Sequence, residues 1–402
     1  MSVSYWQDTD AGRLLGVDCD VLIIGAGLAG LSTAYWLRKK DPALRVVLVD
    51  RGRIGEGASG RNGGFITCGS TEHFSRMTTA YGEEKATKIW EFTEDNHSLL
   101  VGEFGLEFLE RACDYRQQGS WTLASTAPEV DTIRETVDML SQKGIQVGWH
   151  NQYEVEQRFR PTDFHPVCVE GFLGGAHYYS DGEIHPGKFL QFLAYKAYSA
   201  AGGNVLENVE IFKFDEEGER LLAIGRGHRI SCDSIVMATN AWTSQLLPEF
   251  EDKITPVRGQ IVMTEPVDMF LEPCYCNFVL DYFRQLPDGR VLIGGFRNAD
   301  VEKEVGFSDE INLVIHEKLE AFLDEHFPLL RDKRIDYRWS GVMGFAADGY
   351  PLVGSVNVEP RIFYTVGFTA HGLGFTFKMG QVLADLMLDG KDPGIFSGRR
   401  LR

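Results

Sequence analysis

Hydrophobic and polar positions along the 402-residue chain switch between two spacings, and each switch predicts a change from strand to helix. A continuous apolar run covers residues 21–24. A helical pattern starts at Leu28, with apolar residues three and four positions apart, and a second apolar run covers 46–49. Short apolar runs are typical of strands buried in a parallel sheet, and a helical stripe between them is typical of the helix that packs on that sheet. The start of the chain therefore predicts a strand–helix–strand unit.

The same two spacings recur to the end of the chain. They predict helices at 81–112, 129–143, 188–201 and 308–327, and a last helix after residue 374. They predict strands at 116–124, 169–179, 204–212, 234–239, 278–283, 291–296 and 362–367. The Pro287-Asp288-Gly289 turn between two of these strands indicates a hairpin. The strands and helices of the domain that contains the first unit are thus interrupted by two inserted segments. This pattern predicts discontinuous domains.

Glycines between the first strand and the first helix predict a bound dinucleotide. Gly25 permits the tight turn, Gly27 lets the backbone approach a pyrophosphate, and Gly30 lets the helix pack closely. The helix N-terminus near Leu28 would point its N–H groups at the phosphates. Asp50, at the end of the second strand, can accept ribose hydroxyls, which favours FAD or NAD over NADP. The predicted contacts are Gly25, Gly27, Leu28, Ala29, Gly30 and Asp50.

A second glycine-rich stretch follows at 53–65. Five glycines in this window argue against a plain helix or strand and predict a backbone that lies against a flat ligand. A flexible surface loop is the alternative, but Arg61 and Asn62 favour the ligand because they suit contacts to phosphate or to a ring edge. We predict contacts from Arg51, Gly57, Ala58, Ser59, Arg61, Asn62, Gly63 and Gly64.

Composition narrows the possible partners. The formal net charge of −18 argues against nucleic acid and anionic membranes. It is compatible with a cationic substrate, although solubility is the simpler explanation. No apolar run reaches the ~18 residues of a membrane span, and the N-terminus lacks the pattern of a secretory signal. Seven scattered cysteines without CxxC pairs predict reduced thiols, a cytoplasmic location and no metal site.

The complete set of motifs resembles the D-amino-acid oxidase-type FAD-dependent oxidoreductases, which include glycine, sarcosine and γ-glutamylputrescine oxidases. The resemblance covers nearly the whole chain. It rests on GAGLAG with Asp50, IGEGASGRNGGF, SDGEIHPGKF, MATNAW, TPVRGQ, DYF with DGRVLIGG, DYRWSG, and GFTAHGLG. GASGRNGG and DYRWSG are most similar to the γ-glutamylputrescine oxidoreductase branch.

The resemblance implies an α/β fold with two discontinuous domains. A Rossmann-like FAD-binding domain would cover 15–80, 185–250 and 338–392. An α+β substrate domain on a mainly antiparallel sheet would cover 81–184 and 251–337. The FAD would be non-covalent, since the chain has Arg61-Asn62 where some relatives carry a linking histidine and no cysteine at 339–367. Further FAD contacts are implied at Val209, Thr239, Asn240, Trp242, Gly341, Gly344, His371, Gly372, Leu373 and Gly374.

The implied activity is oxidation of the C–N bond of an amine or amino acid. Hydride would pass from the substrate carbon to the flavin, the imine would hydrolyse, and dioxygen or another acceptor would take the electrons. His371, Tyr282 and Trp339 are the candidate catalytic residues. The loop of His371 could stabilise charge on the reduced flavin, with helix capping as the alternative role. Tyr282 and Trp339, with Phe283 and Phe345, could form an aromatic wall suited to alkylamines, with core packing as the alternative.

Two departures from the family weaken a simple amino acid as the substrate. Glycine-type oxidases carry an arginine just after the WSG-like turn, and sarcosine oxidases carry a lysine three residues after the histidine. Here the first place holds no arginine, and the second holds Gly374. A carboxylate that is buried without a cation is unfavourable. Lys378 and Arg338 are candidate replacements. The favoured substrate is a γ-glutamylputrescine-like or other alkylamine. The alternatives are an N-methyl amino acid, glycine or D-amino acid oxidase, and an electron-transfer subunit of a larger complex.

Overall fold

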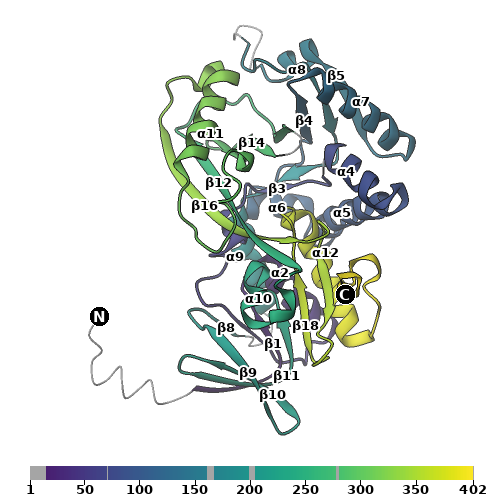
Figure 1. The fold of residues 1–402 in the computed structure, drawn as a ribbon, viewed down its shortest axis with the longest axis vertical. Helices are drawn as coiled ribbons and strands as arrows, with labels where there is room; N and C mark the ends of the chain where they lie inside the picture. Colours follow the sequence, from purple (N-terminus) through teal and green to yellow (C-terminus); the bar gives the residue numbers. More distant parts are fainter. Residues whose placement is uncertain (1–14, 70, 161–166, 199–203, 278–279, 402) are drawn as a thin grey trace, which may run out of the picture. The chain divides into compact units, whose positions relative to one another are not determined.

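A computed structural model of the chain describes residues 15–69, 71–160, 167–198, 204–277 and 280–401 (Figure 1). The chain forms two compact units. Unit 1 consists of Met1–Gly60, Gly187–Pro256 and Met343–Arg402, and unit 2 consists of Arg61–Pro186 and Val257–Val342. The bounds of the FAD-binding and substrate domains given above stay a prediction.

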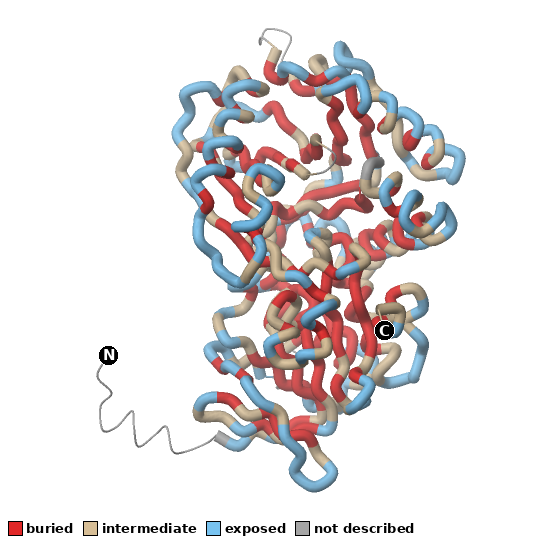
Figure 2. Tube along the Cα trace, viewed as in Figure 1, coloured by how far each residue is buried: buried red, intermediate tan, exposed pale blue. Residues whose placement is uncertain are grey.

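Unit 1 is built on a sheet with the strand order β17-β18-β11-β1-β2-β8. All neighbouring pairs in this order are parallel except the edge pair β17–β18, and β9 and β10 extend β11 as antiparallel strands. The strands are β1 (Leu15–Ile24), β2 (Val46–Val49), β8 (Asn204–Leu206), β9 (Ile211–Glu217), β10 (Arg220–Gly225), β11 (His228–Met237), β17 (Leu352–Ser355) and β18 (Ile362–Val366). The apolar runs are buried in this sheet, in segments that the tube of Figure 2 shows in red. The Rossmann-like fold class is confirmed.

Helices α2 (Leu28–Lys40) and α12 (Gly372–Asp389) of unit 1 pack on each other. The indole N–H of Trp36 donates a hydrogen bond of 2.9 Å to the carbonyl of Phe377. A Cβ at Gly380 would lie 2.6 Å from the backbone carbon of Ser32, so only glycine permits this close approach. These contacts hold α12 against α2, the helix that follows the glycine motif.

Unit 2 is built on a second sheet, in the order β16-β12-β15-β14-β13-β4-β6-β5. Of the pairs whose register is described, only β13–β4 is parallel, which confirms the mainly antiparallel sheet. The strands are β4 (Ser120–Ala124), β5 (Val147–Asn151), β6 (Gly174–Tyr178), β12 (Ile254–Thr264), β13 (Cys274–Cys276), β14 (Asp281–Gln285), β15 (Val291–Gly294) and β16 (Ile335–Ala346). A short pair, β3 (Phe65–Ile66) and β7 (Gly182–Glu183), accompanies it.

The helices of unit 2 differ from the predicted ranges at their ends. They are α4 (Thr71–Tyr81), α5 (Glu83–Phe104), α6 (Leu106–Cys113), α7 (Ala127–Gln142), α8 (Gln152–Arg158) and α11 (Leu313–His326). The helix predicted at 81–112 is interrupted because Gly105 adopts a φ of 82°. The helix predicted at 308–327 begins later, since the side chain of Asn312 caps it by accepting a bond of 3.2 Å from the N–H of Val314.

Strand predictions also need correction. The strand predicted at 204–212 is two strands, β8 and β9, because the chain turns at Asn208 with a φ of 60°. The strand predicted at 116–124 begins only at Ser120, after Gly119 with a φ of 86°. Helix α9 (Pro186–Tyr198) matches the prediction at 188–201 as far as Tyr198, and the predicted stop at 202–203 lies outside the described residues.

The described residues contain no helix that is long and apolar enough to cross a membrane. They also contain no group of three or more His, Cys, Asp or Glu side chains that could hold a metal ion. All seven cysteines are buried.

Candidate functional site

The glycine motif of unit 1 is a tight turn whose shape requires glycine at Gly25 and Gly30, where a Cβ would meet backbone atoms. Gly25 has a φ of 112°, and a Cβ there would lie 2.5 Å from the carbonyl oxygen of Ala238. A Cβ at Gly30 would lie 1.9 Å from the carbonyl oxygen of Gly25, and one at Gly27 would lie 2.7 Å from Oγ of Ser59. The turn therefore presents backbone without side chains, which allows a pyrophosphate to approach it closely.

The N-terminus of α2 presents backbone donors beside this turn. The N–H of Leu28 donates to Oγ of Ser59 at 2.9 Å. The N–H groups of Ala29 and Gly30 have no hydrogen-bond partner among the described residues, as is usual in the first turn of a helix. Free N–H groups and the helix dipole together favour a bound anion.

Asp50 is fixed against the same turn by two backbone hydrogen bonds. Its Oδ2 accepts from the N–H of Ala26 at 2.7 Å, and its Oδ1 accepts from the N–H of Gly52 at 2.8 Å. The N–H of Val209 donates to the carbonyl of Asp50 at 2.8 Å. A carboxylate oxygen has more than one lone-pair site, so both oxygens can still accept ribose hydroxyls.

The glycine-rich stretch after Asp50 contains a short helix, α3 (Ala58–Arg61). A Cβ at Gly55 would lie 2.4 Å from Leu190, and one at Gly60 would lie 2.3 Å from the carbonyl oxygen of Gly55, so these two glycines are required by the fold itself. A Cβ at Gly57 would meet nothing within 4 Å. Packing within the fold therefore does not explain a glycine at position 57, whereas the close approach of a bound ligand would.

Residues that follow β11 and β18 meet at the carboxyl ends of the parallel strands. The guanidinium of Arg51 lies 4.3 Å above the ring of Trp242. Asn240, in the short helix η1 (Asn240–Trp242), has a φ of 46° and accepts a bond of 3.0 Å from the N–H of Gly367. Thr239 bonds Thr243 through their hydroxyls at 2.8 Å. Ligands of open α/β sheets bind at this edge.

His371 occupies the N-cap position of α12, but its side chain makes no capping hydrogen bond. Thr369 and Ala370 before it have φ values of 46° and 65°, a conformation that non-glycine residues adopt rarely. Gly372, Leu373 and Gly374 form the first turn of the helix. A Cβ at Gly344 would lie 2.6 Å from Oδ1 of Asn240.

In unit 2, Arg61 and Trp339 are joined by hydrogen bonds. The indole N–H of Trp339 donates to the carbonyl of Arg61 at 2.9 Å, and Nη1 of Arg61 donates to the carbonyl of Ser340 at 2.9 Å. A Cβ at Gly341 would lie 3.1 Å from Cβ of Arg61. The glycine-rich stretch and the DYRWSG motif, which are distant in the sequence, are therefore neighbours in the fold.

Tyr282 lies beside the end of the glycine-rich stretch. A Cβ at Gly63 would lie 3.1 Å from Cε2 of Tyr282, and the Phe65 ring meets the Tyr282 ring edge-on at 5.6 Å. The side chain of Asn62 accepts a bond of 2.8 Å from the N–H of Gly64. Phe283, predicted as part of an aromatic wall, is fully buried in the core of unit 2, because alternate residues of a strand point to opposite faces.

The two candidate carboxylate-binding cations have different surroundings. Arg338 is exposed and pairs with Glu320 at 2.7 Å. Lys378 is half-buried in α12. Arg297, a half-buried residue whose charge acts to lower the pKa of Tyr282, was not among the residues predicted from the sequence. Its only signal in the sequence is its place directly after the DGRVLIGGF segment.

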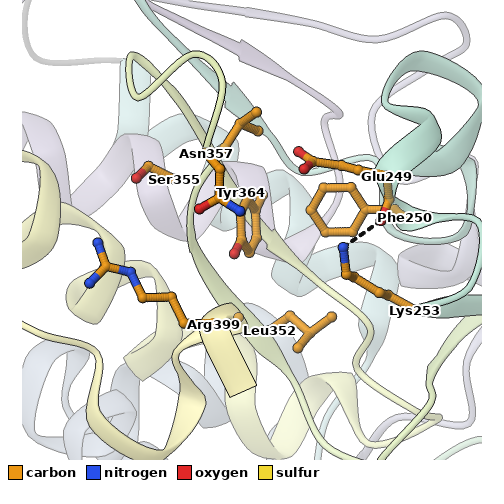
Figure 3. Close-up of a pocket in the computed structure, with 10 residues that line it drawn as sticks. Glu249, Phe250, Lys253, Leu352, Ser355, Asn357, Tyr364 and Arg399 are labelled. Carbon is orange, nitrogen blue, oxygen red and sulfur yellow. Dashed lines mark hydrogen bonds between the residues drawn. The ribbon is translucent and has the colours of Figure 1, made fainter. Parts of the chain in front are cut away.

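A small pocket of unit 1 lies away from these residues and is lined in part by Lys253, Tyr364 and Arg399 (Figure 3). Lys253 donates a bond of 2.6 Å to the carbonyl of Glu249 at its rim. The pocket holds about 20 Å³, which is room for one water. It is far too small for a nucleotide or a substrate.

Comparison with known proteins places the chain among flavin enzymes. The family described as DAO, FAD dependent oxidoreductase, matches residues 20–386. γ-Glutamylputrescine oxidoreductase of Escherichia coli is 26% identical over 386 residues, which cover 92% of this chain and 84% of the relative. Glycine oxidase of Bacillus subtilis is 22% identical over 378 residues, with 92% and 93% covered. The crystal structure of glycine oxidase from Bacillus cereus superposes with a TM-score of 0.78 at 19% identity, covering 94% of this chain and 97% of that chain.

Proposed function

The chain belongs to the DAO family of FAD-dependent oxidoreductases, and from that premise we propose that it oxidises the C–N bond of an alkylamine. One relative is named for γ-glutamylputrescine and another for glycine, and both substrates have a C–N bond at a carbon that carries hydrogen. A bound FAD would supply the hydride acceptor for that carbon, and the product would be an imine that water can hydrolyse.

The residues of unit 1 fit the nucleotide half of FAD, and this fit is the observation that carries the proposal. The bare turn at Gly25 and Gly27 and the free donors at Ala29 and Gly30 suit a pyrophosphate. Asp50, held by Ala26 and Gly52, presents lone pairs for ribose hydroxyls. No cysteine lies at 339–367, so we propose that FAD is held without a covalent bond.

The first turn of α12 is our proposed site for charge stabilisation. The positive end of the helix dipole starts at Gly372, after the two bends at Thr369 and Ala370. Dipoles that are fixed before the reaction stabilise a developing negative charge without reorganisation. We assign this role to the backbone of residues 372–374 and to His371.

Tyr282 and Trp339 are our proposed substrate-binding aromatics. The N–H of Trp339 donates to the carbonyl of Arg61, which fixes the indole ring, and the residue is only half-buried. The Tyr282 ring is fixed by Phe65 and by the backbone at Gly63. Aromatic faces attract alkylammonium groups.

An anaerobic screen tests the proposal. The full-length protein carrying FAD is mixed with γ-glutamylputrescine, putrescine, sarcosine, glycine and D-alanine, and loss of the oxidised-flavin absorbance is followed. We expect γ-glutamylputrescine or putrescine to bleach the flavin fastest. If dithionite reduces the flavin and no amine or amino acid does, the proposal fails and an electron-transfer subunit is the better account. Faster bleaching by sarcosine, glycine or D-alanine would instead support the amino acid alternative.

A further inference from the structure

A surface loop of unit 2, residues 301–311, closes on itself directly before α11. The side-chain amide of Asn312, the N-cap of α11, donates a hydrogen bond of 3.0 Å to the carboxylate of Asp300. The two ends of the loop are therefore neighbours, as in compact surface loops of this length. Val301 and Leu313 each adjoin one member of the bonded pair, so their side chains start from neighbouring backbone.

The interior of the 301–311 loop is fixed to the strands of unit 2. Nη2 of the buried Arg258 donates a bond of 2.8 Å to the carbonyl of Lys303. The hydroxyl of Ser340 donates to the carbonyl of Asp309, and the carboxylate of Asp309 lies 3.5 Å from Nη2 of Arg61. Side chains on the outer surface of the loop are thus held in place, which lowers the entropy lost when another molecule binds them.

The 301–311 loop and the first turn of α11 expose large apolar side chains. The exposed fraction reaches 68% at Leu313 and 59% at Val301. We call the whole set the apolar patch: Val301, Val305, Phe307, Ile311, Leu313 and Val314. Isolated apolar side chains are ordinary on a protein surface, but several on one fixed segment are typical of a surface that another molecule covers.

The exposed face of α11 continues the apolar patch with two opposite charges. Glu317 and Lys318 lie one turn after Leu313 and Val314 on the same stripe, because residues four apart are neighbours on a helix. Both are exposed, and neither has an ion-pair partner among the described residues. In a two-fold symmetric interface residue i meets residue j and j meets i. A two-fold axis here would pair Glu317 of each copy with Lys318 of the other.

We propose that the apolar patch and the exposed face of α11 form the interface of a homodimer. The second copy is the favoured occupant because the two charges are complementary to themselves under two-fold symmetry. Exposed Glu302 and Glu310 beside the patch make an anionic membrane unfavourable. Ala321 is the next residue of the stripe, and its small side chain leaves room for Leu313 of the partner subunit in an antiparallel pairing. This inference does not depend on the proposed function.

Sedimentation equilibrium of the FAD-loaded full-length protein tests the interface. We expect the wild type to be a dimer. Leu313→Asp should raise the dimer Kd by about 100-fold or more, because a central apolar contact is lost twice in a symmetric pair. Its FAD content and melting temperature should match the wild type, since Leu313 is exposed. Val358→Asp is the matched control: Val358 is even more exposed but lies outside the patch, so this variant should dimerise normally.

A charge swap tests the two-fold pairing itself. Glu317→Lys and Lys318→Glu should each raise the dimer Kd by about 2- to 10-fold, because each change sets like charges against each other across the axis. The double variant restores opposite charges and should return to nearly the Kd of the wild type. Effects confined to one copy would not produce this recovery, since both residues are exposed and far from the core of unit 2.

Three results would contradict the homodimer. A wild type that stays monomeric throughout the concentration range would overturn it, and flotation of that monomer with phosphatidylcholine vesicles would show that the patch binds lipid instead. A dimer whose Kd is unchanged in Leu313→Asp forms through another surface, which also overturns the proposal. A double variant that dimerises no better than the two single variants contradicts the pairing of Glu317 with Lys318.

Discussion

The backbone N–H of Ala26 donates a hydrogen bond of 2.7 Å to Oδ2 of Asp50. This bond ties the glycine turn to the acid that ends the next strand, so the carboxylate is already positioned before a ribose binds. Asp50→Ala should raise the Kd for FAD by about tenfold or more, because a hydrogen bond to a charged group is worth about 1.5–3 kcal/mol. Flavin fluorescence quenching measures this Kd. An unchanged Kd would show that Asp50 does not bind the ribose.

Gly30→Ala should prevent tight packing of α2 on the glycine turn. The new Cβ would lie 1.9 Å from the carbonyl oxygen of Gly25, which is backbone and cannot move aside cheaply. We expect loss of FAD and a lower melting temperature. Gly102→Ala in α5 is the matched control, since a Cβ there meets nothing within 4 Å; it should stabilise the helix by up to about 1 kcal/mol. Normal FAD content in Gly30→Ala would refute the packing argument.

Glu304 holds a buried ionic network in unit 2 whose loss should destabilise that unit. It pairs with buried Arg258 at 2.9 Å and accepts bonds from Gln260 at 3.0 Å and Asn312 at 2.9 Å. Glu304→Gln should lower the free energy of unfolding by about 3–5 kcal/mol, because it leaves the buried Arg258 charge without its partner. Urea denaturation measures this, with exposed Glu302→Gln as control. Equal stability of the two variants would contradict the prediction.

Asp181 should make the stability of unit 2 depend on pH. It is fully buried, and burial raises its pKa to about 7 against the hydrogen bonds from Ser120 and Cys68. Since the folded-state pKa lies above the unfolded value of 3.8, the folded state favours the protonated acid. Its contribution is therefore fully present below about pH 4 and is lost as the pH rises towards 7.

The Asp181→Asn variant removes this titration. Between pH 5 and pH 8, the unfolding free energy of the wild type should fall by at most about 3 kcal/mol more than that of the variant. Urea denaturation of both proteins at the two pH values gives the difference. A difference that does not change with pH would mean that Asp181 titrates normally.

The sequence predicted those parts of the fold whose signals are local. The strand–helix–strand unit around Gly25 and Asp50 was predicted because its apolar runs, glycines and acid all lie within thirty residues or so, an extent typical of such units. The break at Gly105 was missed, since an amphipathic pattern can continue across a glycine whose φ turns positive. Nor does local sequence show that Trp339 and Arg61, far apart in the chain, hydrogen-bond each other. Arg297 was missed for a related reason: its position depends on the backbone angles of Gly295 and Phe296.

The most direct test of the central claim is a single-turnover reaction of the FAD-loaded protein with γ-glutamylputrescine in the absence of oxygen. Oxidation at the carbon next to the nitrogen predicts one aldehyde formed per flavin reduced, and slower flavin reduction when that carbon carries deuterium. Flavin that stays oxidised with this amine and with every other amine tested, or reduction without a carbonyl product, would contradict it.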